Sequence, residues 1–92
     1  MRALITGSNG FIGRNLKFYL FNFNIQVFEF NRGDKIALLK KLVENVDIIF
    51  HLAGENRSIN KKNFNKNNFH LTKKIVDCVI ESKKKTPIIF TS

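Results

Sequence analysis

Three glycines at intervals of three residues stand near the start of the chain, between a short apolar segment and a stretch of helical periodicity. They are Gly7, Gly10 and Gly13. A glycine at a strand end permits a sharp turn, a second lets backbone approach a pyrophosphate, and a third allows a helix to pack closely. The N–H groups and the dipole at the start of the helix then face phosphate anions. This placement predicts a nucleotide-binding turn, and the alternative is a tight turn that binds nothing.

Apolar periodicity predicts alternating strands and helices along the chain. The expected strands are residues 2–6, 25–30, 46–52 and 87–92. The expected helices are marked by apolar residues at near-helical spacing: Ile12, Leu16, Leu20 and Phe23; Ile36, Leu39, Leu42 and Val43; and Phe69, Ile75, Val76, Val79 and Ile80. Residues 55–66 are polar and predict a loop with at most one turn of helix. Because strands alternate with helices over short connections, we expect parallel pairing through right-handed crossovers in one α/β domain. It would be a doubly wound, Rossmann-like parallel sheet holding four strands of an incomplete domain.

The charge balance is basic, with 16 Lys or Arg against 7 Asp or Glu and a net charge of +9. Clustered cations would suggest a nucleic-acid partner. The charge is spread evenly, however, with +4 in residues 1–46 and +5 in residues 47–92. Lys, Asn, Ile and Phe, all with A/T-rich codons, are abundant, so we interpret the excess as a trace of base composition and expect no nucleic-acid partner. The lysine run at 83–85 is interpreted as a solvated helix end.

Location and metal content are constrained by what the sequence lacks. No apolar run reaches the roughly 18 residues of a membrane span, and Gly7 comes too early for a signal peptide. Cys78 is the single cysteine and lies in an apolar-periodic stretch, so it is expected to be a buried core thiol. We therefore expect a cytoplasmic protein without a membrane segment, a disulfide framework or a metal centre.

Residues 6–13 resemble the TGxxGxxG motif of the extended short-chain dehydrogenase/reductases, which include nucleotide-sugar epimerases, dehydratases and reductases. Asn9 occupies the second glycine of the wider G-x-G-x-x-G motif. The resemblance implies a nicotinamide dinucleotide cofactor held by the turn. The implied contacts are Gly7, Ser8, Asn9, Gly10, Phe11, Ile12 and Gly13.

The end of the second strand bears on the choice of cofactor, because an acidic residue there binds the ribose hydroxyls of NAD. By its spacing from the glycines, Asn31 falls where NAD-binding members usually carry Asp, and Arg32 follows it. Asn does not repel a 2′-phosphate, and the guanidinium of Arg matches phosphate oxygens. The pair predicts NADP(H) over NAD(H). Glu29 is the competing ribose ligand, and Arg32 is alternatively an ordinary turn residue.

The segment after the third strand resembles the part of the family that passes under the cofactor, which implies contacts from Leu52, Ala53 and Gly54. His51 has no partner by recognisable spacing and is interpreted as a packed strand-end histidine. Residues 54–57, with Phe64 and Asn68, resemble the reductases that act on UDP-2-acetamido-2,6-dideoxy-hexos-4-uloses in capsule and O-antigen synthesis.

Within that resemblance, Asn68 and Thr72 match residues common at the start of this helix, and Asn68 is counted among the cofactor contacts. Asn56 and Arg57 either contact substrate or cofactor at the edge of the site or form a loop salt bridge. Only residues 31–45 separate the second and third strands, which leaves room for one helix and no identifiable adenine contacts.

The family's catalytic Tyr-x-x-x-Lys motif is absent, because the single tyrosine, Tyr19, is followed four residues later by Phe23. Ser92 matches the first position of the family's Ser-rich stretch and is taken as a cofactor contact; no catalytic residue is assigned. We therefore expect residues 1–92 to be the N-terminal, NADP(H)-binding fragment of a nucleotide-sugar reductase or epimerase, inactive alone. A UDP-sugar substrate and any homodimer would belong to the full-length protein. The alternative is a stand-alone, non-catalytic dinucleotide-binding or redox-sensing module.

Overall fold

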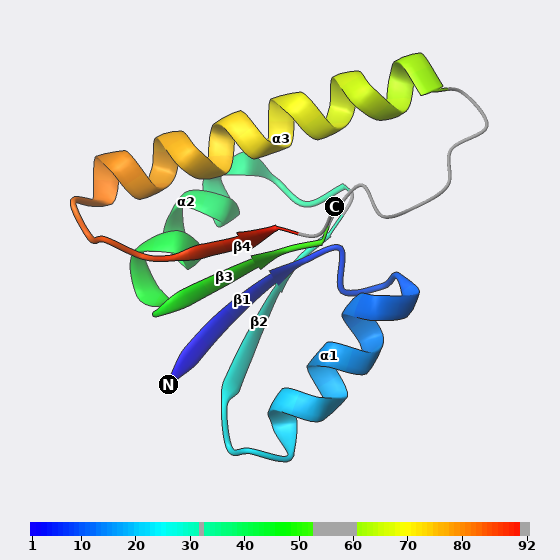
Figure 1. Cartoon of the computed structure of the whole chain (residues 1–92). Helices are drawn as coiled ribbons and strands as arrows, with labels where there is room; N and C mark the ends of the chain where they lie inside the picture. Colours follow the sequence, from blue (N-terminus) through cyan, green and yellow to red (C-terminus); the bar gives the residue numbers. More distant parts are fainter. Residues whose placement is uncertain (32, 53–60, 91–92) are drawn as a thin grey trace.

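The computed structural model describes residues 1–31, 33–52 and 61–90, and the side chains of residues 61–69 are outside the description. The elements in chain order are β1 (Arg2–Thr6), α1 (Phe11–Phe21), β2 (Gln26–Phe30), α2 (Ile36–Asn45), β3 (Ile48–His51), α3 (Lys61–Ser82) and β4 (Ile88–Phe90) (Figure 1).

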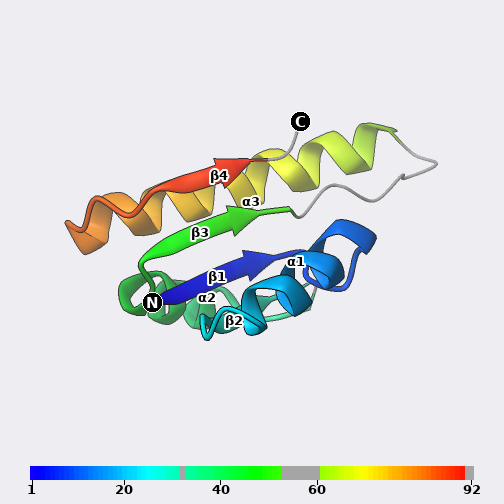
Figure 2. The same cartoon turned by 60° about the horizontal axis from the view of Figure 1, so that its bottom comes forward.

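The four described strands form one parallel sheet in the order β2-β1-β3-β4. Helix α1 covers one face of the sheet, and α2 and α3 cover the other (Figure 2). The sheet is therefore doubly wound, with the winding reversing between β1 and β3, as the sequence predicts. In the register of the sheet, Thr6 pairs with both Phe30 and His51, so the carboxyl ends of the three strands meet at one edge.

Two apolar clusters hold the layers together, one on each face of the sheet. Alternation along β1 divides its fully buried residues between them, because successive side chains point to opposite faces. Leu4 packs with Leu39 of α2 and Ile75 of α3. Ala3 and Ile5 pack with Leu20 of α1. Cys78 is a free, buried thiol in the first cluster, where burial raises its pKa, which confirms the expectation of a core cysteine.

The end of α1 differs from the expected helix. Phe23 lies beyond the last helical residue and is 60% exposed, and Ile12 is 44% exposed, so neither belongs to the buried face. The N–H of Phe23 donates to the carbonyl of Leu20 at 3.0 Å, which tightens the last turn. Asn24 then adopts a φ of 59°, and this left-handed conformation ends the helix.

Helix α3 is longer than its apolar pattern indicates. It begins at Lys61, so the prediction of a loop was wrong for residues 61–66, while residues 55–60 lie outside the description. Apolar periodicity marks only the part of a helix that faces a core. Lys and Asn cost less than about 0.7 kcal/mol per residue relative to Ala, so a polar segment can still continue a helix.

The lysines at 83–85 in the connection from α3 to β4 are exposed, as expected of a solvated helix end, and Lys84 makes further hydrogen bonds there. Lys83 has a φ of 59° and follows the end of the helix. The Lys84 ammonium donates to the carbonyls of Glu44 at 3.1 Å and Val46 at 3.0 Å. Lys84 therefore ties this connection to the C-terminal end of α2, where a cation is electrostatically favoured.

Candidate functional site

The candidate site lies at the carboxyl edge of the sheet, where β1 and β3 are neighbours and the helices depart to opposite faces. In open α/β sheets, ligands bind outside the carboxyl ends of the strands at such a switch point. The glycine-rich turn follows β1, Asn31 follows β2, and Leu52 follows β3. The fold therefore brings together three of the predicted cofactor-binding segments.

The geometry of the turn requires glycine at two positions. Gly7 has a φ of 76°, and its N–H donates to the carbonyl of Phe30 at 3.2 Å. A Cβ on Gly13 would lie 2.3 Å from the carbonyl oxygen of Gly7 and 2.7 Å from the Cα of Ser8. The first glycine therefore makes the sharp turn that the sequence predicts. The third lets α1 lie directly against the backbone of the turn.

The start of α1 has no side-chain cap. Gly10 is the N-cap residue, has an extended conformation and makes no side-chain cap, and the first turn of this fully described helix holds no acidic residue. The N–H of Arg14 donates to the carbonyl of Gly10 at 2.9 Å. The positive end of the helix dipole is therefore not neutralised by an acidic side chain of its own helix, which suits an anion. Asn9, Phe11 and Ile12 are exposed beside it.

Ser8 connects the turn to the end of β2. Its side chain is buried, and its hydroxyl donates to Oε1 of Glu29 at 2.7 Å. The Nδ2 of Asn31 donates to the same hydroxyl oxygen at 2.8 Å. The residue predicted to meet the ribose is thereby hydrogen-bonded to the turn predicted to meet the pyrophosphate.

Glu29 carries a second interaction, with Lys17 of α1, whose ammonium lies 3.1 Å from both carboxylate oxygens. The hydrogen bond from Ser8 lowers the pKa of Glu29, burial opposes that shift, and the hydrogen bond and charge of Lys17 add to it. Glu29 is therefore an ionised carboxylate bound by two protein groups. The loop after β2 is closed separately, because the N–H of Asn31 donates to Oδ2 of Asp34 at 2.8 Å.

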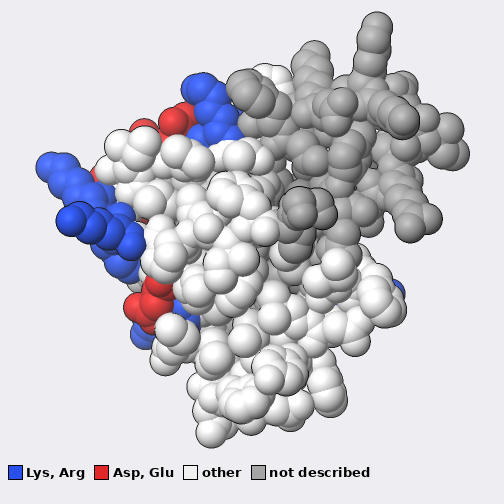
Figure 3. Space-filling view, in the orientation of Figure 1, with Lys and Arg blue, Asp and Glu red and all other residues white. Residues whose placement is uncertain are grey.

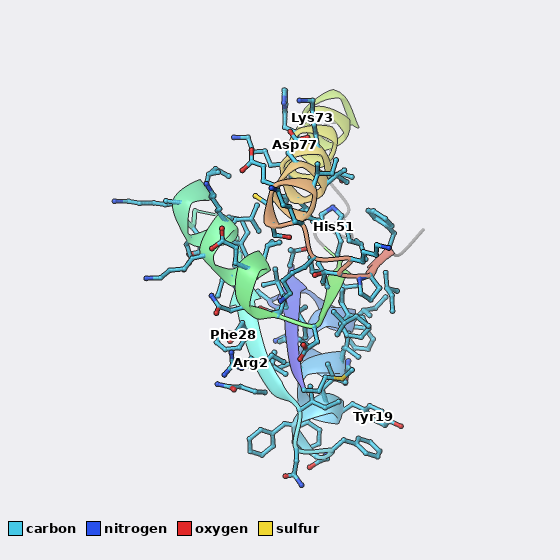
Figure 4. All side chains as sticks on the ribbon, turned by 90° about the vertical axis from the view of Figure 1, so that its left-hand side faces the viewer. Arg2, Tyr19, Phe28, His51, Lys73 and Asp77 are labelled. Carbon is cyan, nitrogen blue, oxygen red and sulfur yellow. The ribbon has the colours of Figure 1, made fainter. Side chains whose placement is uncertain are left out.

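His51 joins three elements at the same edge (Figure 4). Its Nδ1 lies 2.6 Å from Oγ1 of Thr6 in β1, and its Nε2 lies 2.8 Å from Oγ1 of Thr72 in α3. The ring of Phe90 contacts it edge-on, with 5.6 Å between ring centroids. Burial lowers the pKa of His51, so the imidazole is neutral at pH 7. This agrees with the interpretation of His51 as a packed strand-end residue.

Leu52 is buried, and its backbone continues the pairing of β3 with β1 beyond the last strand residue. Its N–H donates to the carbonyl of Thr6 at 3.0 Å and to the Thr6 hydroxyl at 3.1 Å. Leu52 therefore lies directly beside the switch point between β1 and β3. The Thr6–His51–Thr72 and Ser8–Glu29 contacts were not anticipated from the sequence, because they join residues more than 20 positions apart with no shared motif.

Several predicted site residues fall in parts of the chain that the structure does not describe. Outside the described residues lie Arg32, Ala53, Gly54, Asn56, Arg57 and Ser92. Asn68 falls within α3, but its side chain is outside the description.

The described surface carries mixed charge. On the face shown in Figure 3, acidic groups lie among the Lys and Arg side chains, and much of the remaining described surface is uncharged. The described ion pairs include Lys40–Glu81 at 3.8 Å and Lys73–Asp77 at 3.4 Å. Within the described ranges, no three His, Cys, Asp or Glu residues are grouped to hold a metal ion. None of the described helices combines the length and apolarity needed to cross a membrane.

Comparison with known proteins extends this description. A reductase from Pseudomonas aeruginosa, UDP-2-acetamido-2,6-beta-L-arabino-hexul-4-ose reductase, is 39% identical over 93 aligned positions. The alignment covers 100% of this chain and 25% of the reductase. The resemblance to this group of reductases is thereby confirmed.

Solved structures agree with the sequence comparison. The capsular polysaccharide assembling protein CapF from Staphylococcus aureus matches with a TM-score of 0.78 and 34% identity over 100% of this chain and 25% of its own. CapF crystallised with the inhibitor 3-isopropenyl-tropolone matches with a TM-score of 0.74 and 29% identity over 100% of this chain and 24% of its own. The chain thus spans about a quarter of the length of these relatives.

The model of the NAD dependent epimerase/dehydratase family matches residues 3–92. That match includes the complete glycine-rich turn and all four described strands except the first residue of β1. The chain belongs to the NAD dependent epimerase/dehydratase family.

Proposed function

We propose that residues 1–92 form the NADP(H)-binding part of a nucleotide-sugar reductase or epimerase. The observation that carries the proposal is the neutral residue Asn31 at the end of β2, hydrogen-bonded to Ser8 of the glycine-rich turn. An acidic residue at that place favours the ribose hydroxyls of NAD, whereas an amide does not repel a 2′-phosphate. Membership of the family supports a nicotinamide dinucleotide in general, and Asn31 supports the phosphorylated form.

The described residues fit this cofactor. The turn from Gly7 to Gly13 has a left-handed first residue, which makes the sharp turn, and a third glycine whose Cβ would collide with the turn, which lets α1 pack closely; a dinucleotide-binding turn has both features. In the proposed site, this turn holds the pyrophosphate, and Asn31 and Arg32 hold the phosphorylated ribose. Further proposed contacts come from the segment after β3, from the first half of α3 and from the chain after β4: Leu52, Ala53, Gly54, Asn68 and Ser92. When bound, the nicotinamide supplies or accepts a hydride.

The proposed substrate is a UDP-sugar, because the similar Pseudomonas protein is named as a reductase of one. Proton transfer is not assigned to these residues. Tyr19 is 60% exposed, packs against Phe23 with 4.9 Å between ring centroids, and lies near the end of α1 away from the glycine-rich turn (Figure 4). We therefore propose that the 92 residues bind cofactor without turning over substrate. Substrate binding and any homodimer would then need further polypeptide, and the proposed location is the cytoplasm.

A thermal-shift titration of the 92-residue chain tests the proposal, because a ligand that binds only the folded state raises the melting temperature. NADPH is expected to raise it more than NADH at equal concentration, and duplex DNA is expected to leave it unchanged. No shift with either dinucleotide would remove the cofactor proposal. A larger shift with DNA than with NADPH would favour a nucleic-acid-binding domain instead.

An assay of NADPH oxidation with a UDP-4-keto sugar separates the proposed function from its alternative. The proposal predicts no turnover by the 92 residues and restored turnover when they are joined to the remaining three quarters of the Pseudomonas reductase. If the 92 residues are instead a stand-alone binding or sensing module, they should bind NADPH, and the chimaera should show no turnover. A chimaera that folds and binds NADPH but does not turn over would therefore favour the module.

A further inference from the structure

We propose that Lys17 tunes the choice between NADPH and NADH by neutralising Glu29, and that Glu29 braces the glycine-rich turn instead of binding ribose. The inference rests on the proposed function, because it concerns the adenosine end of the same cofactor site. Neither the family match nor the glycine motif gives a role to Lys17 or Glu29.

The bracing role follows from the hydrogen bonds of Ser8. A serine hydroxyl has one proton to donate and lone pairs that accept. Here Oε1 of Glu29 is the nearer acceptor for that proton, at 2.7 Å against 3.1 Å for Oδ1 of Asn31, while the hydroxyl oxygen accepts from Nδ2 of Asn31 at 2.8 Å. Since Ser8 is 1% exposed, water cannot replace either partner without rearrangement of the turn. Glu29 therefore fixes the hydroxyl that holds the Asn31 amide.

The electrostatic role follows from the strand geometry. Glu29 and Asn31 are two residues apart at the end of β2, so their side chains lie on the same face, which is the face that α1 covers. Helix α1 brings Lys17 to that face, with its ammonium 3.1 Å from both oxygens of Glu29. A carboxylate on the same face as Asn31, two residues before it, is thereby paired with a cation from a different element.

The pairing matters more for one cofactor than for the other. A phosphate monoester carries about −1.5 to −2 charges at pH 7, whereas the ribose 2′-hydroxyl of NADH carries none. An unpaired carboxylate at Glu29 would repel a phosphate bound at the end of β2. The side chains of Lys17 and Glu29 are 48% and 35% exposed, so solvent and salt moderate the effect without removing it.

The experiment measures dissociation constants of NADPH and NADH by isothermal titration at pH 7.5 and low salt. Lys17→Met is expected to raise the ratio Kd(NADPH)/Kd(NADH) by about three- to tenfold, because it leaves the carboxylate uncompensated. The double variant Lys17→Met/Glu29→Gln is expected to return the ratio to within about twofold of the unmodified chain. Gln keeps an oxygen that accepts the Ser8 proton, so the brace survives while the charge is lost.

Lys40→Met is the matched control, since Lys40 is an exposed lysine paired with Glu81 on the α2–α3 face. It removes the same charge from the other side of the sheet and should leave the ratio unchanged. Raising the salt to 0.5 M should reduce the effect of Lys17→Met, because the Debye length falls to about 4 Å.

Three results would overturn the inference while leaving the proposed function intact. In the first, the unmodified chain binds both dinucleotides, but Lys17→Met changes both affinities equally or not at all. In the second, the double variant stays as impaired for NADPH as Lys17→Met, which would mean that Lys17 contacts the phosphate directly. A loss of NADH affinity of tenfold or more in Glu29→Gln alone would instead identify Glu29 as the ribose ligand. Failure of the unmodified chain to bind either dinucleotide would count against the proposed function itself.

Discussion

Thr6 and His51 are register partners in adjacent parallel strands, and their side chains meet at 2.6 Å at the point where the sheet changes its winding. The other imidazole nitrogen of His51 reaches Thr72 at 2.8 Å, so a single side chain links β1, β3 and α3. The N–H of Leu52 adds two hydrogen bonds at the same place, one to the carbonyl and one to the hydroxyl of Thr6. The edge that the proposed cofactor would lie against is therefore held by buried polar contacts between β1, β3 and α3.

His51 makes stability depend on pH. Burial lowers the pKa of His51, so the folded protein binds a proton less readily than the unfolded chain, whose histidine titrates near 6.5. The contribution of His51 to the free energy of unfolding is fully present above the unfolded-state pKa, about 6.5. It is lost as the pH falls below that value and through the lower folded-state pKa. Urea unfolding at pH 7.5, 6.5 and 5.5 should show this decline. In His51→Asn the decline should be smaller, and the variant should be destabilised by about 1–3 kcal/mol; an unchanged pH slope would contradict the assignment.

Gly13→Ala should be strongly destabilising. The new Cβ would lie 2.3 Å from the carbonyl oxygen of Gly7, so the backbone of the turn must move, at an expected cost of about 2–4 kcal/mol. Gly33→Ala is the matched control: Gly33 has a φ of 95° but no atom within 4 Å of its added Cβ. Strain alone should cost that variant about 1–2 kcal/mol. Denaturant midpoints compare the two, and an equal or smaller loss in Gly13→Ala would refute the close-approach explanation.

Two buried threonines should respond in opposite ways to loss of their hydroxyl groups. Thr86 is 7% exposed, and its hydroxyl has no hydrogen-bond partner among the described residues, so Thr86→Val should be neutral or stabilising by up to about 1 kcal/mol. Thr6→Val removes the contact with His51 and one of the two acceptors for Leu52 N–H, and should cost about 1–3 kcal/mol. Thermal and urea unfolding of both variants check the contrast. A destabilised Thr86→Val would reveal a partner for that hydroxyl.

Lys84 should contribute more to stability than its neighbours in the lysine run. Lys84→Met removes two charge-assisted hydrogen bonds to the carbonyls at the end of α2, for an expected loss of about 0.5–1.5 kcal/mol. Lys85→Met removes the same charge next to it and should change the free energy of unfolding by less than about 0.5 kcal/mol. The difference is read from urea unfolding at 0.1 M salt; equal effects would mean that only the net charge matters.

The topology was predictable from the sequence because apolar periodicity reports burial. Leu4, Ile5 and Ile49 lie in continuous apolar runs that a strand covered on both faces requires, and each is fully buried. The glycine spacing was equally informative, since Gly7 adopts a left-handed conformation that favours glycine and Gly13 leaves no space for a Cβ.

What the sequence could not supply were polar contacts between distant segments. The Ser8–Glu29 and His51–Thr72 hydrogen bonds each span 21 positions and depend on how the helices lie against the sheet. Periodicity also failed where the sequence of a helix is polar, as over residues 61–66 of α3. The overprediction of Phe23 as helical core has a related cause, because spacing alone cannot show where a helix stops.

The central claim, that the end of β2 is built for NADP(H), is tested most directly by the dissociation constants of NADPH and NADH for the unmodified chain and for Asn31→Asp. The unmodified chain should bind NADPH more tightly than NADH. A carboxylate at position 31 should weaken NADPH binding by about tenfold or more while leaving NADH binding within about twofold. Equal affinities for the two dinucleotides in the unmodified chain, or equal losses in the variant, would contradict the claim.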